Sequence, residues 1–183
     1  MPTYVALLRG INVGGNKKIA MSDLRSLLAR VGYTNIRTHL NSGNAVFAAA
    51  DEDAGRVAGA IESAIQDSLG LSVRCIVRTA AEMRGVVDAT PLEFVSTGGS
   101  RLAVHFLAEA PDPTLLAAHD PTALAPDQIR LGDRLIYQWC PDGFLAAPDV
   151  GAFVRMHWRA VVTARNWNTV AKLAELAGTG SRP

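Results

Sequence analysis

The sequence has few cysteines and none of the ligand spacings that metal sites use. Its two cysteines, Cys75 and Cys140, each lie in an apolar run typical of a strand, and its four histidines are scattered along the chain. Zinc sites need three or four such ligands at short, fixed spacings. The sequence therefore predicts no metal site and no cofactor. It also predicts two buried thiols that are not paired with each other.

A strong net charge is absent as well. Lys and Arg total 18 and Asp and Glu total 17, which gives a formal net charge of +1. Nonspecific nucleic-acid binding rests on a basic excess, so this balance disfavours a nucleic-acid partner. No apolar run approaches the ~20 residues that span a bilayer, and the N-terminus lacks the features of a signal peptide. We expect a cytoplasmic protein without a membrane partner, and the sequence carries no signal for an oligomeric state.

The spacing of apolar residues alternates between the periods of strands and helices. From residue 3 to residue 88 the predicted order is strand, helix, strand, strand, helix, strand and short helix. The same order begins again after residue 100, and it ends with a short strand near 160–163 and a helix from about 167 to 177. Between the two halves, residues 90–100 contain the Gly, Ser, Thr and Pro that are typical of a linker.

This repeated order predicts an α+β fold of two ferredoxin-like βαββαβ units in tandem, a duplication, each followed by an extra helix. The predicted domains are residues 1–89 and 101–178, joined by the linker 90–100, and residues 179–183 form a flexible tail. The first strand of each half is apolar on both faces, which indicates a central strand buried on both sides. One continuous sheet shared by both halves is the alternative.

The first of three polar segments joins the first strand to the first helix. It reads Arg9-Gly10-Ile11-Asn12-Val13-Gly14-Gly15-Asn16-Lys17-Lys18, and at about ten residues it is longer than most connections of this kind. Its glycines permit close approach to a ligand, and its three basic side chains favour an anion. A P-loop is excluded, because Asn16 stands where the lysine belongs and no Ser or Thr follows. A structural loop is the favoured alternative.

The second polar segment, Asn41-Ser42-Gly43-Asn44, is explained by a hairpin turn, but turn chemistry does not call for an amide at Asn44. In a ferredoxin-like unit we expect this turn and the glycine loop to lie at opposite ends of the sheet.

The third polar segment leads into the last helix and reads Thr163-Ala164-Arg165-Asn166-Trp167-Asn168-Thr169. Asn166 or Thr163 can cap that helix. Arg165 beside a helix N-terminus favours an anion, because the free N–H groups and the helix dipole are both positive there. The alternative is that Arg165 is a solvated or ion-paired surface charge.

With these three segments the sequence resembles the bacterial family grouped as domain of unknown function 1697. The resemblance spans essentially the whole chain, and the motifs occur in the family's order. It implies a bacterial cytosolic protein with a duplicated α/β fold. It implies no activity.

The leading functional hypothesis is a binding protein for a small anionic ligand, a nucleotide or a phosphate-bearing metabolite, in a cleft between the two halves. An enzyme acting on such a ligand and an RNA-binding protein are the alternatives, and the sequence identifies no catalytic residue. The candidate ligand-binding residues are Arg9, Asn12, Gly14, Gly15, Lys17, Lys18, Asn41, Ser42, Asn44, Arg165 and Asn166. Arg9, Asn12 and Arg165 are expected to converge on one anion site.

Overall fold

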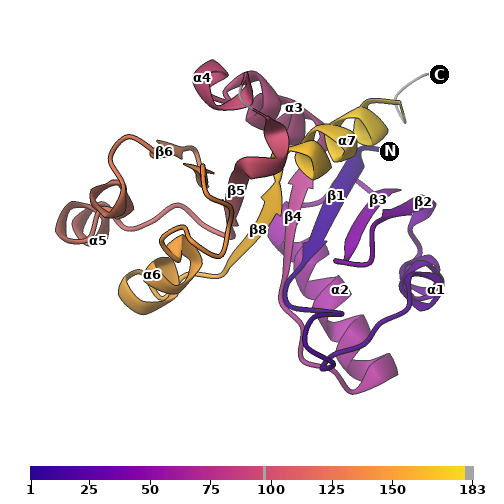
Figure 1. Ribbon diagram of the computed structural model, residues 1–183. Coiled ribbons are helices and arrows are strands. Elements are labelled where there is room, and N and C mark those ends of the chain that lie inside the picture. The colour runs from indigo at the N-terminus through magenta and orange to yellow at the C-terminus, as the bar shows by residue number, and fades with distance from the viewer. Residues whose placement is uncertain (97, 180–183) are drawn as a thin grey trace. The chain divides into compact units, whose positions relative to one another are not determined.

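The structure is a computed structural model that describes residues 1–96 and 98–179. Within these ranges the chain has a mixed α+β fold with seven α-helices and two separate four-stranded antiparallel sheets (Figure 1). The alternative of one continuous sheet is therefore wrong. Two compact units are present: Met1–Gly85 together with the chain from Lys172 onward, and Val86–Ala171.

The first unit contains a sheet and two helices. Its elements in chain order are β1 (Thr3–Leu8), α1 (Met21–Val31), β2 (Thr34–His39), β3 (Asn44–Ala48), α2 (Ala54–Leu69) and β4 (Cys75–Thr79). The strand order is β2-β3-β1-β4, so the first strand is central, as predicted. All six residues of β1 are buried, which explains why the strand is apolar on both faces.

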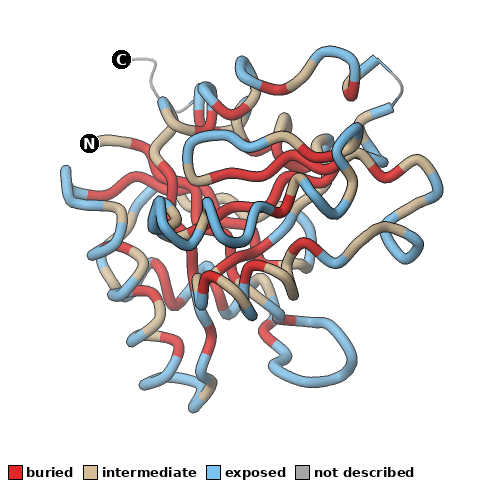
Figure 2. The backbone as a smooth tube through the Cα atoms, turned by 90° about the vertical axis from the view of Figure 1, so that its left-hand side faces the viewer, coloured by how far each residue is buried: buried red, intermediate tan, exposed pale blue. Residues whose placement is uncertain are grey.

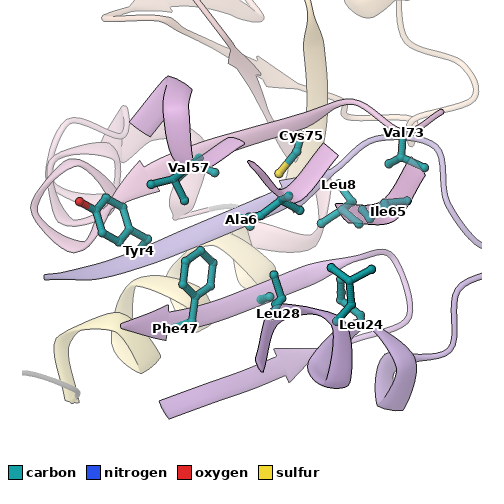
Figure 3. Close-up of a cluster of buried hydrophobic side chains, with 14 of the residues drawn as sticks. Tyr4, Ala6, Leu8, Leu24, Leu28, Phe47, Val57, Ile65, Val73 and Cys75 are labelled. Carbon is teal, nitrogen blue, oxygen red and sulfur yellow. The ribbon is translucent and has the colours of Figure 1, made fainter. Parts of the chain in front are cut away.

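Helices α1 and α2 cover one face of this sheet. Leu24 and Leu28 of α1 and Val57 and Ile65 of α2 point toward Ala6 and the other side chains of that face (Figure 3). Asp53 caps α2 through its side chain, which accepts from the backbone N–H groups of the first turn. The amphipathic pattern of the two helices therefore predicts the core of this unit.

The second unit repeats the strand order with a different set of helices. Its elements in chain order, including two helices that cross the unit boundary, are α3 (Ala80–Asp88), α4 (Leu92–Val95), η1 (Gly99–Arg101), β5 (Leu102–Leu107), α5 (Pro113–Ala118), η2 (Pro121–Leu124), β6 (Ile129–Gly132), β7 (Leu135–Trp139), α6 (Val150–His157), β8 (Val162–Asn166) and α7 (Trp167–Gly178). The strand order is β6-β7-β5-β8. Figure 2 shows that burial follows the strands, whereas the connections are largely exposed.

The helix that follows β7 is short. Helix α6 has 8 residues, whereas α2 has 16, so the two helices are about 12 and 24 Å long. Val150 and Val154 of α6 pack with Leu107, Ile136 and Val162 at one end of the sheet face. Because α6 is this short, the other end of the face lies against residues 140–149, the segment that connects β7 to α6.

The segment 90–100 was predicted as a linker, but it contains the helix α4 and the turn η1. Phe94 of α4 is buried, stacks on Trp139 and lies under the guanidinium of Arg130 at 5.4 Å. Thr90 accepts a hydrogen bond from Trp167 Nε1. These contacts hold the segment against the second unit, because burial of the Phe94 ring stabilises the packed helix over a solvated linker.

The compact units have other boundaries than the predicted domains. Tyr137 of β7 donates to the Val86 carbonyl at 2.7 Å, so the second unit already includes the end of α3. At the other end of the chain, Arg37 of β2 donates to the Leu176 carbonyl at 2.6 Å, so the end of α7 belongs to the first unit. The predicted tail lies outside the described residues except for Thr179.

Cys75 and Cys140 are both buried and no disulfide joins them, which confirms the prediction that they are not paired with each other. Over the described part of the chain, every helix is too short or too polar to cross a membrane. The same part of the chain holds no cluster of three His, Cys, Asp or Glu side chains suited to a metal ion.

Candidate functional site

The glycine loop of the first unit folds into a small hairpin of its own. Val13 and Asn16 form a bridge, and the Asn12 N–H donates to the Lys17 carbonyl at 3.2 Å. Gly14 and Gly15 at the tip have φ of 63° and 81°, the positive values that a type I′ turn requires at both central residues. The two glycines are therefore explained by the turn, and their ligand-binding role stays a prediction.

Asn12 joins this loop to the hairpin turn after β2. Its Nδ2 donates to the Ile19 carbonyl at 2.9 Å and to the Asn41 carbonyl at 2.7 Å, and its Oδ1 accepts from the Ile19 N–H at 2.9 Å. The expectation that the two segments lie at opposite ends of the sheet is therefore wrong. Since β1 and β3 are antiparallel, the end of β1 lies beside the start of β3, and the Leu8 N–H donates to the Gly43 carbonyl at 2.8 Å.

The amide of Asn44 also has a structural environment. The residue is fully buried, and its Nδ2 donates to the His39 carbonyl and to Ser42 Oγ at 2.8 and 3.0 Å. Asn44 thus holds the tight turn closed from inside the sheet, which turn propensity alone did not indicate.

Hydrogen bonds to the backbone bring the basic residues of the glycine loop close to the chain at residues 72–74. The Arg9 N–H donates to the Arg74 carbonyl, and Lys17 Nζ donates to the Ser72 carbonyl at 2.8 Å. Lys18 is exposed, and Arg74 pairs with Glu62 at 3.2 Å. These residues form a solvated basic surface around the glycine loop, where ion pairs stabilise little.

A pocket of about 400 Å³ lies in the second unit, at the end of the sheet face that α6 leaves uncovered. Its floor comes from β5, β7 and β8, and its wall from the 140–149 segment. The lining residues are Ala103, His105, Gln138, Cys140, Phe144, Leu145, Ala147, Pro148, Asp149, Val150, Ala164, Arg165 and Asn166. This volume is within the range of small-molecule sites.

His105 is the most informative residue of this pocket. It lies in the middle of β5, is 7% exposed, and its Nε2 is 2.9 Å from Gln138 Oε1. Gln138 Nε2 donates to the Pro148 carbonyl at 2.8 Å, which fixes the amide with its oxygen toward the histidine. That oxygen needs a donor, so the proton of the imidazole is on Nε2, and Nδ1 is an acceptor.

Nδ1 of His105 is the only buried side-chain nitrogen or oxygen without a hydrogen-bond partner in the described ranges. A buried acceptor of this kind is destabilising by about 1–3 kcal/mol. Burial lowers the pKa of His105 below its ordinary 6.5, although the Gln138 hydrogen bond and the Asp149 carboxylate oppose the shift. The imidazole is therefore neutral near pH 7.

Of the residues predicted from sequence, Arg165 and Asn166 line this pocket. Asn166 Oδ1 accepts from the N–H and the hydroxyl of Thr169, both at 2.9 Å, so the predicted capping of the last helix is confirmed. Arg165 pairs with Val104 in the sheet, and its Nη1 donates to Thr163 Oγ1 at 3.0 Å. The positive end of the α7 dipole thus lies at the margin of the pocket, whereas the Arg165 side chain leaves the sheet on the face opposite His105, where it contacts Thr163.

The remaining ionisable groups of the pocket favour binding over nucleophilic chemistry. Burial raises the pKa of the Cys140 thiol to about 11, so the reactive thiolate is absent at neutral pH. The Asp149 side chain accepts from the Ala152 N–H at 2.7 Å as the N-cap of α6. Neutral His105 and a capping carboxylate offer acceptors to a ligand rather than a catalytic pair.

The lowered pKa of His105 predicts a pH dependence of stability. Because the folded-state pKa lies below the unfolded value of 6.5, the unfolded chain takes up the proton first as the pH falls. Stability from this group is therefore present above pH 6.5 and is lost below it, by at most about 1.4 kcal/mol per pH unit. We expect His105→Phe/Gln138→Leu, which removes both partners, to lose this part of the slope in urea unfolding between pH 7 and 5. An unchanged slope would show that His105 titrates normally.

His105, Gln138 and the 140–149 segment were not among the residues predicted from the sequence. One signal was present, because His105 interrupts a strand that is otherwise apolar on both faces, where a polar residue needs a specific partner. The pocket itself depends on the length of α6, and helix ends are the least certain part of a sequence-based prediction.

Comparison with known proteins identifies the family. The chain belongs to the DUF1697 family of proteins of unknown function, whose sequence profile matches residues 1–137. It is similar to the conserved bacterial protein SP0830 from Streptococcus pneumoniae, whose solved structure aligns over 96% of this chain and 98% of that one with a TM-score of 0.67 and 21% identity. This likeness shows the fold alone. No curated protein matches the chain.

Proposed function

We propose that this protein binds a small anionic ligand, a nucleotide or another phosphate-bearing metabolite, in the pocket of its second unit. The observation that carries the proposal is the buried His105 in the pocket floor, whose Nδ1 has no hydrogen-bond partner among the described residues. Native proteins pair nearly all their buried polar atoms, and the exceptions concentrate at functional sites. The ring borders the pocket, but Nδ1 itself is closed to solvent, so a bound ligand supplies the missing N–H or O–H donor by displacing the side chains that cover this nitrogen.

The margin of the pocket supports the anionic part of the proposal. The N-terminus of α7, which begins directly after Asn166, presents the positive end of a helix dipole to the pocket. The carboxylate of Asp149 is already used as the cap of α6, which leaves its charge partly neutralised by that helix. We therefore assign the phosphate of the ligand to the Asn166 side of the pocket, at the N-terminus of α7, and its donor group to the His105 side.

The proposal also includes a finer description of the fold and its origin. Each sheet has the strand order of a ferredoxin-like unit, which supports two such units that arose by duplication in a bacterial cytoplasmic protein. The convergence of Arg9 and Asn12 with Arg165 in a cleft between the halves stays a prediction. The ligand site proposed here uses the second unit alone.

A variant that fills the pocket tests the proposal. Ala164 is exposed and lines the pocket, so Ala164→Phe adds a ring to the cavity without disturbing the core. We expect isothermal titration with AMP to show at least tenfold weaker binding for this variant than for the wild-type protein, because the ring occupies the ligand volume.

Ala146→Phe is the matched control. Ala146 is also exposed, but it lines the smaller neighbouring pocket and not the proposed ligand pocket. The AMP affinity of this variant should therefore stay at the wild-type value. The proposal is wrong if Ala164→Phe binds AMP as the wild-type protein does. It is also wrong if the wild-type protein binds none of AMP, ribose 5-phosphate and inorganic phosphate.

A further inference from the structure

The wall of the pocket presents large apolar side chains to solvent. Leu145 is 105% exposed and Phe144 is 49% exposed, and both belong to the 140–149 segment that faces the polar floor of His105 and Gln138. Single exposed apolar residues are ordinary on a protein surface. Two adjacent ones at the mouth of a cavity are typical of a ligand-binding rim.

Two neighbouring cavities border the 140–149 segment. Besides the pocket of about 400 Å³, a second cavity of about 270 Å³ lies against Pro141, Gly143 and Ala146 of the same segment. Gly143 has a φ of 89°, a conformation that glycine adopts without strain. Hydrogen bonds hold Cys140 to Arg101 and Pro148 to Gln138 at the two ends of the segment. Phe144 and Leu145 between them are exposed, so this apolar tip has room to move toward an occupant of the larger pocket.

We propose that the ligand carries an aromatic body beside its anionic group, and that Phe144 and Leu145 cover this body when it is bound. This inference rests on the proposed function and adds the chemical class of the ligand: an aromatic phosphate of mononucleotide size. A flat ring offers an apolar face to Leu145 and Phe144 and an N–H donor at its edge to His105. An aliphatic sugar phosphate has hydroxyl donors for His105 but no flat apolar face, so it gains nothing from the rim.

Two probes that share a phosphate separate the aromatic body from the anion. AMP carries the adenine ring, whereas ribose 5-phosphate is the same molecule without it. We expect the wild-type protein to bind AMP at least tenfold more tightly in isothermal titration. Leu145→Ala should weaken AMP binding about fivefold, because it removes apolar contact area, and should leave the affinity for ribose 5-phosphate within twofold of wild type. Leu145 is fully exposed, so this variant retains the fold.

Leu92→Ala is the matched control, because Leu92 is 82% exposed in α4 and does not line the pocket. It should bind both probes as the wild-type protein does. The inference is overturned if AMP binds no more tightly than ribose 5-phosphate, or if Leu145→Ala weakens both probes equally. In either case, the proposed function still holds if the wild-type protein binds ribose 5-phosphate and Ala164→Phe abolishes that binding. Failure of the wild-type protein to bind either probe or inorganic phosphate overturns the proposed function itself.

Discussion

Replacing Gly43 by alanine should lower the free energy of unfolding by about 3 kcal/mol, the sum of two effects. Gly43 has a φ of 87°, where an L-residue is strained by about 1–2 kcal/mol. A Cβ atom built there lies 2.7 Å from Ile11 Cδ1 and 2.9 Å from Leu8 Cβ, and such overpacking destabilises by about 1–3 kcal/mol. Urea unfolding followed by far-UV circular dichroism measures the difference.

Gly14→Ala separates the two contributions at Gly43. Gly14 has a similar φ of 63°, but a Cβ there meets no atom within 4 Å, so only the backbone strain of about 1 kcal/mol applies. If the two variants lose the same stability, Gly43 is not in close contact with Ile11 and Leu8. The glycine loop then does not pack closely on the hairpin turn.

Replacing Asn12 by alanine should lower the free energy of unfolding by about 2 kcal/mol, because three side-chain hydrogen bonds of about 1 kcal/mol each are removed and water replaces part of them. Two of these bonds close the loop on Ile19, and the third reaches Asn41. Asn12 also has a φ of 56°, which asparagine tolerates better than alanine does. The measurement is again the unfolding midpoint in urea.

Asn16→Ala controls for the loop itself. Asn16 is exposed in the same small hairpin, where its backbone forms the bridge to Val13, so its replacement should change stability by no more than about 0.5 kcal/mol. An equal loss for Asn12→Ala and Asn16→Ala would mean that the loop is mobile in solution and that the Asn12 bonds do not hold it to the turn.

The sequence predicts most of the fold and little of the pocket. Hydrophobic periodicity located the strands and long helices, and Asn166 was named correctly as a helix cap, because these features depend on residues close together in the chain. The position of Asn41 beside Asn12 was not predicted, because the end of β1 was expected at the opposite end of the sheet from the start of β3. No residue of the two segments was ambiguous. The helix α4 within the segment 90–100 was not predicted, because Phe94 is buried by Trp139 and Arg130, which are distant in sequence.

The pocket escaped prediction for a different physical reason. The pocket exists because α6 has only 8 residues and covers only part of the sheet face. The sequence of the 140–149 segment indicates a loop and nothing more. His105 gains its importance from Gln138 and Pro148, which lie 33 and 43 positions further along the chain. Its partner-free nitrogen is a property of the packed structure, so a single sequence does not show it.

Helix α7 begins in the second unit and ends in the first, where Arg37 binds the Leu176 carbonyl. The first unit is thus assembled from the two ends of the chain, and the second is inserted between them. During synthesis on the ribosome, residues 1–85 emerge before the second unit but depend on the residues from 172 onward, which follow it. The second unit, continuous in sequence, has all of its residues before that point. The domain that is translated first is therefore the one that is completed last.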